Sequence, residues 1–267
     1  MALKLTSTDD TSRTDEANPY WISFSDIMAG LLIVFVLATL ALILELTQTR
    51  MEVNQALIEL AQAEQVRRDI LREVEAELLQ KNIPVEVSDN ETVLRIPDNL
   101  LTFESNEYVL PRSAGIRDNV KVIGETLYSA ITRDERWRYL DTIFVEGHTD
   151  IRTSPRNMGN WGLSTFRAIT VWNYWNATQP EDERLGLLVN RSGVPLFSVS
   201  GYAETRPVLA EQRTEEDFQR NRRIDVRFTV RRPALEDLEA IQKVLTDGRT
   251  TDAVSGRDAA RAAGGEL

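Results

Sequence analysis

The sequence predicts an α+β protein with a single N-terminal transmembrane helix, a helical stalk, and a domain in which strands alternate with helices. No charged residue occurs from Ile27 to Leu44, and a helix of about 20 mostly apolar residues spans the hydrocarbon of a bilayer. No glycine or proline occurs over residues 31–83, so a helix can continue past the apolar run. From Val85 the pattern changes to short strand-like runs separated by amphipathic helices.

Composition excludes several classes of function. The 267-residue chain has no cysteine, which excludes disulfides and thiolate metal sites, and its single histidine, His148, excludes a multi-histidine metal site. The net charge of −11 argues against nucleic-acid binding, which normally requires a basic face. Ser164 lies near His148 in the sequence, but there is no G-x-S-x-G elbow and no P-loop. We therefore expect no enzyme activity, no metal, no cofactor and no direct nucleic-acid partner.

The predicted transmembrane helix covers residues 21–46 and follows an N-terminal tail of residues 1–20. Pro19 marks the start of the helix, and Tyr20 with Trp21 suits an aromatic belt at the membrane surface. A cleaved signal peptide is the alternative. It is disfavoured because the preceding residues are acidic rather than basic and no A-x-A site follows the apolar run. The tail has too few basic residues for the positive-inside rule to set the orientation.

Asp26 is the one charged residue inside this apolar segment. An ionised aspartate costs about 2.5–3.5 kcal/mol at the centre of a membrane helix, and less near an end. One interpretation is an interfacial acid that reaches the headgroups or benefits from the helix dipole. The other is a proton or ion relay that faces protein, with Gly30 on the same face leaving room for a partner helix and Ile22 and Ile33 completing a packing stripe. We predict the second.

Residues 47–83 are predicted to form a helical linker that lifts the next domain off the membrane. They are rich in strong helix formers. Apolar residues recur at helical spacing at Leu57, Leu60, Ile70, Val74 and Leu78. Glu64 and Arg67 interrupt that stripe, which argues against a regular coiled coil. Weak pairing with a second copy and an unpaired spacer both remain open.

The remaining chain is predicted to contain a mixed domain over residues 84–232 and a C-terminal segment over residues 233–267. Strands are expected within residues 91–98, 140–150, 196–207 and 221–230, and helices within 115–131 and 160–175. Alternation of this kind favours helices packed on one face of a sheet. The last segment begins with a short predicted helix and ends in a Gly/Ala-rich stretch without apolar period, so we expect a flexible tail.

Four motifs connect this domain to a known family. "VEGHTD", "NWGLSTFRA", "SGYAETRPV" and "NRRIDVRF" resemble, in this order, the signature blocks of the OmpA-like peptidoglycan-binding domain. The resemblance implies a βαβαβ domain that holds the diaminopimelate carboxylate and amine of a cell-wall peptide. By position, the binding aspartate falls on Asp150 and the binding arginine on Arg167. Further contact positions fall on Thr149, Asn160, Leu163, and Arg222 or Arg223. The spacing from Asp150 to Arg167 is about two residues longer than in common members.

The chemistry of the two principal residues is consistent with that role. A zwitterionic ligand needs an acceptor for its ammonium and a planar donor for its carboxylate, and arginine supplies the planar donor. Asp150 ends a predicted strand and Arg167 lies on the following predicted helix, so both can reach one cleft. The alternative is a structural Asp–Arg pair at a strand–helix junction. His148 is expected to order the adjoining turn rather than to titrate.

The membrane segment carries a second resemblance. "YWISFSDIMAGLLIVFV" is similar to the membrane helix of the flagellar stator family MotB, with its aspartate at Asp26. The acidic N-terminus and the "NPYWISFSDIMAGLL" entry make the whole chain resemble the ZorB family of the Zorya anti-phage defence systems. That family implies a dimer inside a ring of a MotA-like, ZorA-like membrane subunit, driven by ion flow past Asp26. A flagellar stator subunit and a passive tether like OmpA or Pal are the alternatives.

The wall-binding resemblance also sets the expected location. A peptidoglycan-binding domain lies outside the cytoplasmic membrane, so we expect a single-pass protein of the bacterial inner membrane with a cytoplasmic N-terminus and a periplasmic C-terminal domain. Protons are favoured over sodium as the driving ion, because only Ser23 and Ser25 offer extra oxygen ligands near Asp26.

Overall fold

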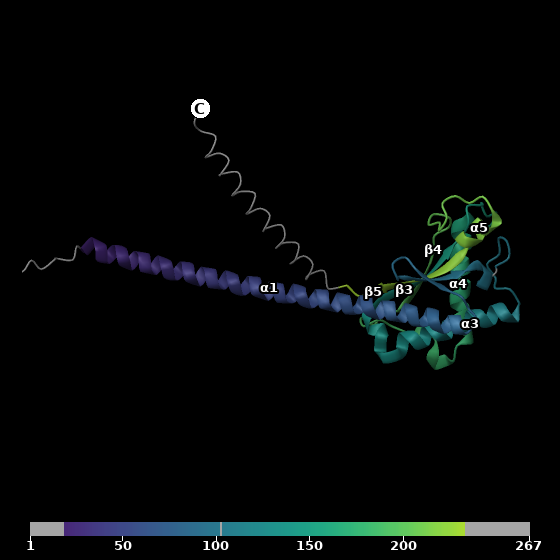
Figure 1. The fold of residues 1–267 in the computed structure, drawn as a ribbon, viewed down its shortest axis with the longest axis horizontal. Coiled ribbons are helices and arrows are strands. Elements are labelled where there is room, and N and C mark those ends of the chain that lie inside the picture. The colour runs from purple at the N-terminus through teal and green to yellow at the C-terminus, as the bar shows by residue number, and fades with distance from the viewer. Residues whose placement is uncertain (1–18, 102, 233–267) are drawn as a thin grey trace, which may run out of the picture. The chain divides into compact units, whose positions relative to one another are not determined.

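The computed structural model describes residues 19–101 and 103–232 and divides the chain into two compact units, with the boundary between Asn54 and Gln55 (Figure 1). Helix α1, Pro19–Gln80, contributes residues to both units. The predicted N-terminal tail lies outside the described residues except for its last two positions, and the predicted C-terminal helix and tail lie wholly outside them.

The first unit is the N-terminal part of α1. All described side chains from Ser23 to Leu46 are exposed, although most of them are apolar. Within the described residues this is the one helix with a stretch long and apolar enough to cross a membrane, with a mean hydropathy of 3.0 over its best window. An apolar helix surface of this length requires a non-aqueous environment, in agreement with the span predicted over residues 21–46.

The second unit is built on a five-stranded sheet. Its strands are β1 (Glu86–Ser88), β2 (Val93–Pro97), β3 (Leu140–His148), β4 (Phe197–Gly201) and β5 (Arg223–Val230). The strand order is β1-β2-β5-β3-β4, with β3 and β4 parallel and the other neighbours antiparallel. The parallel pair needs a crossover, which α4 provides between β3 and β4. The central strands β5 and β3 therefore bring distant parts of the chain together.

Helices cover one face of this sheet (Figure 1). They are α2 (Asp98–Leu101), α3 (Ala114–Thr132) and α4 (Gly159–Thr178), whereas α5 (Glu215–Asn221) contributes no side chain to the apolar core. Short 3-10 turns lie at Arg133–Tyr139, Glu181–Glu183 and Leu185–Leu187. Side chains of α3, α4, β3 and β5 form a common apolar core, in which Trp175 is fully buried and donates its indole N–H to the Val120 carbonyl at 2.7 Å. The predicted α+β class and all four predicted strands are confirmed, and β1, α2 and α5 are additional.

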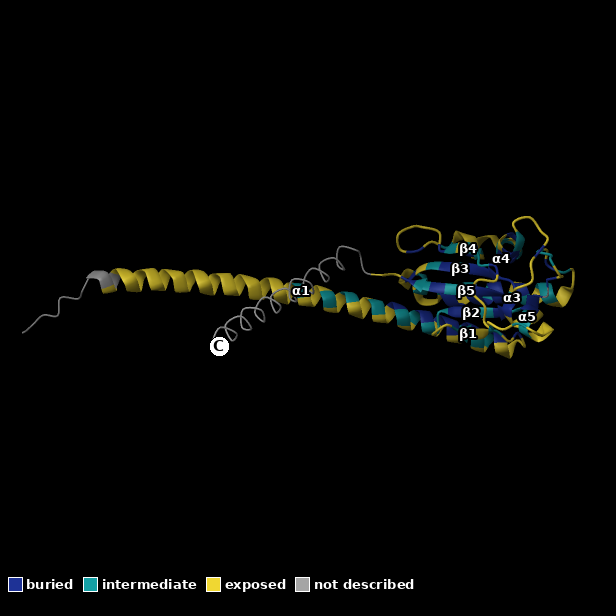
Figure 2. Ribbon diagram, turned by 90° about the horizontal axis from the view of Figure 1, so that it is seen from above, coloured by how far each residue is buried: buried dark blue, intermediate teal, exposed yellow. Residues whose placement is uncertain are grey.

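The C-terminal part of α1 belongs to the domain core. Ile70, Leu71, Val74 and Leu78 are fully buried in the same cluster as the apolar side chains of α3, as the dark blue turns of α1 in Figure 2 show. The apolar stripe in the predicted linker is therefore largely a packing surface for this domain. Arg67, which interrupts the stripe, is buried at its edge.

Two glycines set the distance between α4 and the sheet. A Cβ atom at Gly147 in β3 would overlap the Ser164 carbonyl, and one at Gly201 in β4 would overlap Thr165. These two glycines are direct partners in the parallel pairing of β3 and β4. The close approach places the first turns of α4 beside the C-terminal end of β3.

Candidate functional site

A cleft of about 470 Å³ opens at the C-terminal end of β3. The cleft is lined by Phe103, Ser105, Asn106, Thr149, Asp150, Arg152, Thr153, Asn160, Leu163, Arg167, Glu215 and Arg222. Strand β3 ends just before Thr149 and Asp150, while α4 contributes Arg167 and the α5–β5 junction contributes Arg222. The structure thus brings six of the seven predicted peptidoglycan contacts to one cavity.

Asp150 is held ionised by two arginines. Its Oδ1 accepts hydrogen bonds from the Arg152 backbone N–H at 2.9 Å and from Arg152 Nε at 3.1 Å. Its Oδ2 accepts from Arg152 Nη2 at 2.6 Å and from Arg222 Nη1 at 3.0 Å. Burial alone would raise the pKa of Asp150, but these bonds hold it below its ordinary value. The carboxylate is therefore a fixed negative charge in the cleft at neutral pH.

Arg222 connects three carboxylates. Its Nε donates to Asp98 at 3.0 Å, and its Nη1 lies 3.0 Å from Asp150 and 2.9 Å from Glu215. Burial opposes the charged form, but the hydrogen bonds to the acids raise the pKa of Arg222. Asp98 is itself buried, and that burial raises its pKa although Arg222 opposes the shift. The side chain of Arg222 is consequently fixed by partners on α2 and α5.

Arg167 is not paired with Asp150. It is 3% exposed, and its Nε and Nη2 donate to the backbone carbonyls of Glu107 at 2.8 Å and Glu104 at 3.2 Å. Burial, with repulsion from Arg222, lowers the pKa of Arg167 to about 10, so it stays charged at neutral pH. Backbone carbonyls satisfy part of the guanidinium without neutralising it. The structural Asp–Arg pair, the alternative considered from the sequence, does not form.

The secondary contact positions differ in whether their side chains are available to a ligand. The buried Thr149 hydroxyl lines the cleft and has no hydrogen-bond partner among the described residues, so a ligand can use it. Asn160 also lines the cleft, but its amide is occupied by the Ser154 N–H at 2.9 Å and by Glu204 at 2.9 Å. Leu163 supplies apolar wall. Thr149 is therefore the secondary polar position whose side chain is open to a ligand.

Arg223 does not line the cleft. It is buried and donates to Asp225 at 2.9 Å and to the Arg206 carbonyl at 3.0 Å. Arg222 caps the C-terminal end of α5, whereas Arg223 is the first residue of β5 and pairs with Asp225, so the two arginines have different partners. Of the two arginines named from the sequence, the structure places Arg222 in the cleft.

Six cleft residues were not named from the sequence, and two of them, Arg152 and Glu215, are charged. Arg152 lies in the lengthened loop after Asp150, and no local signal marked it as a partner of that aspartate. Glu215 follows Thr214, which caps α5 in a reciprocal capping box with Asp217. The Thr-x-x-Asp spacing is readable in the sequence and predicts a helix start there, which would have found α5 and Glu215.

A separate ionic cluster lies on the sheet face away from the helices. Glu146 and His148 of β3 lie beside Asp225 of β5, and all three are buried. His148 Nε2 is 3.5 Å from Asp225 Oδ2, and the ring stacks on Tyr202 at 5.5 Å between centroids. Burial and nearby arginines lower the pKa of His148 to about 2, so this histidine is neutral. Neither ring nitrogen has a hydrogen-bond partner among the described residues, so the role of His148 in ordering the turn stays a prediction.

Arginines neutralise this cluster. Asp225 accepts from Arg95 Nε at 3.2 Å and from Arg223 Nε at 2.9 Å, while Glu146 accepts from Arg227 Nε at 3.0 Å. The three acidic or imidazole ligand atoms lie within 4.8 Å of one another, a spacing that a metal ion can use. Here guanidinium groups already bind both carboxylates, and a further cation would meet their charge. The arrangement is an ion-pair network that ties β2, β5 and β3 together.

Asp26 lies outside this domain, in the first unit. Its side chain is exposed on α1, like its described neighbours. No hydrogen bond or ion pair to another described residue involves it. Its predicted contact is with partner subunits, so its role as an ion relay stays a prediction.

Comparison with known proteins supports the nature of the domain. Residues 102–222 match the model of the OmpA family, a segment that contains the cleft residues Asp150, Arg167 and Arg222. The predicted OmpA-like domain is confirmed over this segment. No curated protein matches the chain.

Several solved structures are similar to the chain. The periplasmic domain of Helicobacter pylori MotB is 23% identical, with a TM-score of 0.42 over 59% of this chain and 88% of that one. A putative MotB-like protein from Desulfovibrio vulgaris is 20% identical, with a TM-score of 0.44 over 64% of this chain and 99% of that one. The cell wall anchor of the T6SS from Pseudomonas aeruginosa is 23% identical, with a TM-score of 0.43 over 61% and 99%.

Proposed function

We propose that this chain is the stationary, peptidoglycan-anchored subunit of a proton-driven rotary motor in the bacterial inner membrane. The observation that carries the proposal is the cleft, in which a fixed carboxylate, Asp150, faces two charged guanidinium groups, Arg167 and Arg222. A diaminopimelate side chain ends in an ammonium and a carboxylate on one carbon. The cleft offers complementary charges for both groups within one cavity.

The roles follow from how each side chain is held. Arg167 uses one N–H of Nε and one of Nη2 on backbone carbonyls, which leaves three of its five N–H donors and its charge for a ligand carboxylate. Asp150 receives the ligand ammonium in place of Arg152, whose half-exposed side chain also pairs with Glu215 and lies over the Phe218 ring. Thr149 adds a buried hydroxyl. Because the cleft residues are fixed by their neighbours, little ordering is required when the wall peptide binds.

Retention on purified peptidoglycan tests this step. The detergent-solubilised full chain is expected to sediment with insoluble murein, and the Asp150→Ala, Arg167→Ala variant is expected to stay in the supernatant. Lys121→Ala with Glu125→Ala, which likewise removes one basic and one acidic side chain but outside the cleft, is the matched control and is expected to sediment normally. Full retention of the first variant would refute binding through the cleft.

The membrane part of the proposal rests on Asp26. A carboxylate in an apolar helix is stable when it faces protein, which requires partner helices from a MotA-like or ZorA-like ring and from a second copy of this chain. One charge crossing the membrane potential supplies about 2.3 kcal/mol per 100 mV. Alternation of Asp26 between charged and neutral forms, on a subunit fixed to the wall, converts that energy into rotation of the surrounding ring.

The biological setting that we propose is Zorya-type anti-phage defence, with the ring partner signalling to effectors. The acidic N-terminal tail and the "NPYWISFSDIMAGLL" entry support this setting over flagellar motility. A flagellar stator of MotB type uses the same aspartate and the same wall anchor. A deletion strain scored both for protection from phage and for swimming motility distinguishes the defence setting from the flagellar one.

Substitution of Asp26 tests the motor itself. Asp26→Asn is expected to abolish protection while co-purification with the ring partner stays normal, because the amide fills the same space but cannot exchange a proton. Ser23→Ala is the control in the same turn region and is expected to keep activity. Full activity of Asp26→Asn would leave only a passive membrane-linked wall tether.

A further inference from the structure

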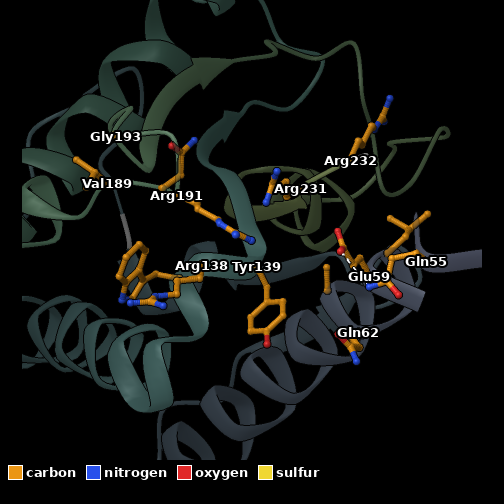
Figure 3. Close-up of a pocket in the computed structure, with 14 residues that line it drawn as sticks. Gln55, Glu59, Gln62, Arg138, Tyr139, Val189, Arg191, Gly193, Arg231 and Arg232 are labelled. Carbon is orange, nitrogen blue, oxygen red and sulfur yellow. Dashed lines mark hydrogen bonds between the residues drawn. The ribbon is translucent and has the colours of Figure 1, made fainter. Parts of the chain in front are cut away.

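A hollow of about 780 Å³ lies at the other end of β3 from the cleft (Figure 3). It lies between the Gln55–Ala63 part of α1, the 3-10 turn that ends at Tyr139, the loop at Asn190–Gly193, and the end of β5. Four arginines line it, Arg138, Arg191, Arg231 and Arg232. We call this site the arginine hollow. Only one acid, Glu59, lines it, so its walls are strongly positive in a chain whose net charge is −11.

Most of these arginines have no partner of their own. Among the described residues, no hydrogen bond or ion pair involves the side chains of Arg191, Arg231 and Arg232. Arg138 pairs with the exposed Glu135 at 2.8 Å, and Glu59 accepts from Gln55 at 3.2 Å. Unpaired guanidinium groups brought together from two separate segments, the Asn190–Gly193 loop and the end of β5, do not favour stability, because they repel one another. Such unpaired guanidinium groups can bind an anionic group of a partner outside the domain.

The hollow is preorganised. The loop that carries Arg191 is held by Asn190, whose Oδ1 accepts from the Ser192 and Val194 N–H groups and whose Nδ2 donates to the Asp141 carbonyl at 3.0 Å. The Arg231 N–H donates to the Tyr139 carbonyl at 3.1 Å, which fixes the end of β5. In Figure 3 Arg191 extends from its loop toward the middle of the hollow. Binding an anion therefore needs little backbone rearrangement.

The position of the hollow in the chain favours a membrane surface as the partner. Nine residue steps separate Leu46, the last residue of the predicted span, from Gln55 at the rim. The covalent chain alone thus keeps the rim within roughly 30 Å of the apolar segment. Trp137 and Tyr139 line the same hollow, and these are the side chains that favour the boundary between headgroups and water.

We propose that the arginine hollow docks on the phosphate headgroups of anionic membrane lipids. This inference rests on the proposed membrane anchoring but not on wall binding. The cleft and the hollow lie at opposite ends of β3, so one end of the domain serves the wall and the other serves the lipid surface. Each arginine near an anionic bilayer contributes roughly fivefold in binding, so the three unpaired arginines contribute about 100-fold to docking.

Energy transfer in nanodiscs tests the proposal with the full chain. The sequence has no cysteine, so Gln62→Cys, on the exposed rim, accepts one fluorophore at a single site. Discs carry an acceptor dye on a trace lipid and contain either phosphatidylcholine alone or equal parts of phosphatidylcholine and phosphatidylglycerol. Transfer is expected to rise in the anionic discs. It is expected to fall again at high salt, because salt screens exposed charges.

Matched variants then assign the effect to the hollow. Arg191→Gln, Arg231→Gln and Arg232→Gln together are expected to lower the docking equilibrium about 100-fold and remove the rise. Arg112→Gln, Lys121→Gln and Arg220→Gln make the same change in net charge elsewhere on the domain and are expected to keep it. An equal response from both triple variants, or no difference between the two lipid compositions, overturns the proposal.

Two further measurements test whether the hollow prefers a soluble anion and whether the chain is anchored in the membrane. Inorganic phosphate is added at constant ionic strength, and abolition of docking by phosphate but not by chloride would show that the hollow prefers a soluble anion, which also overturns the proposal. Flotation with liposomes checks the anchoring on which the inference rests. Sedimentation with murein is expected to be unchanged in the hollow variant, so failure of lipid docking and failure of wall binding are told apart.

Discussion

Arginines line both the cleft and the arginine hollow, which lie at opposite ends of one strand. The two sites differ in how the arginine side chains are paired. In the cleft Arg222 contacts three carboxylates and Arg167 is held by two backbone carbonyls. In the hollow Arg191 and Arg231 have no partner among the described side chains. A charge held by neighbours has a fixed direction and suits recognition of one small zwitterion. An unpaired charge has a broad field and suits an extended anionic surface.

The same contrast applies to stability. The ion-pair network around Asp225 is buried, and its arginines depend on its acids. The side chains of Arg191, Arg231 and Arg232 in the hollow are exposed to solvent and have no hydrogen-bond or ion-pair partner among the described residues. Substitutions in the two places should therefore have very different costs, and the predictions below measure that difference in order of decreasing size.

The largest effect is expected for Asp225→Ala. Removing this carboxylate leaves Arg95 and Arg223 largely buried without their common partner, which should lower the free energy of unfolding by about 3–5 kcal/mol. Urea unfolding of the detergent-solubilised full chain, followed by tryptophan fluorescence, measures it. Arg231→Gln is the matched control and should change stability by less than about 0.5 kcal/mol. Equal costs for the two variants would contradict the distinction between paired and unpaired arginines.

A smaller effect is expected from the pH dependence of His148. Its folded pKa of about 2 lies below the ordinary value of 6.5, so the unfolded state binds this proton first. The contribution of neutral His148 is fully present above pH 6.5 and is lost progressively as the pH falls toward 2. At pH 5 the loss is about 2 kcal/mol. Urea unfolding at pH 7 and pH 5 should show a smaller acid loss in His148→Gln than in the parent chain.

The acidic side chains of the protein titrate in the same pH range as the unfolded histidine. The test therefore compares the acid-induced loss of stability in the variant with that in the parent chain, rather than two pH values of one protein. Parallel stability curves for His148→Gln and the parent chain would show that the pKa of His148 is not lowered in the folded state. The burial of this ring between two acids and several arginines would then need another account.

The smallest effect is expected at Arg152. This half-exposed arginine occupies Asp150 where the ligand ammonium is proposed to bind. An exposed pair of this kind contributes up to about 1 kcal/mol, so Arg152→Ala should strengthen retention on murein by up to about fivefold. Arg213→Ala, which removes another exposed arginine that pairs with Glu211, should leave retention unchanged. Weaker retention of Arg152→Ala would mean that Arg152 contacts the wall peptide rather than competing with it.

Much of the architecture was predictable because the signals are local. The charge-free segment Ile27–Leu44 needs only its own composition to indicate a membrane span, and the strand from Leu140 to His148 shows its period within nine residues. The same holds for the cleft. The aspartate at the end of β3 and the arginine two turns into α4 are close in the sequence, so their meeting in one cavity follows from the strand–helix order.

Other features depend on contacts between distant segments. The apolar residues Ile70 and Val74 looked like a linker stripe, because nothing near them in the sequence shows that α3 covers them. The choice of Arg222 over Arg223 depends on where α5 ends and β5 begins, and on the pairing of Arg223 with Asp225. The partner of Asp150 in the free cleft, Arg152, depends on the path of a loop.

The sequence by itself determined the class of fold, the membrane segment with its single carboxylate, and the two principal residues of the cleft, because each is encoded within a few neighbouring residues. Only the tertiary structure decided that about half of the predicted linker packs into the domain core. It also decided that the arginines around Asp225 are buried and paired, whereas those of the arginine hollow are exposed. The arginine hollow takes its charges from residues 138, 191, 231 and 232. Those positions become neighbours only after β3 and β5 pair, so no local pattern could have predicted it.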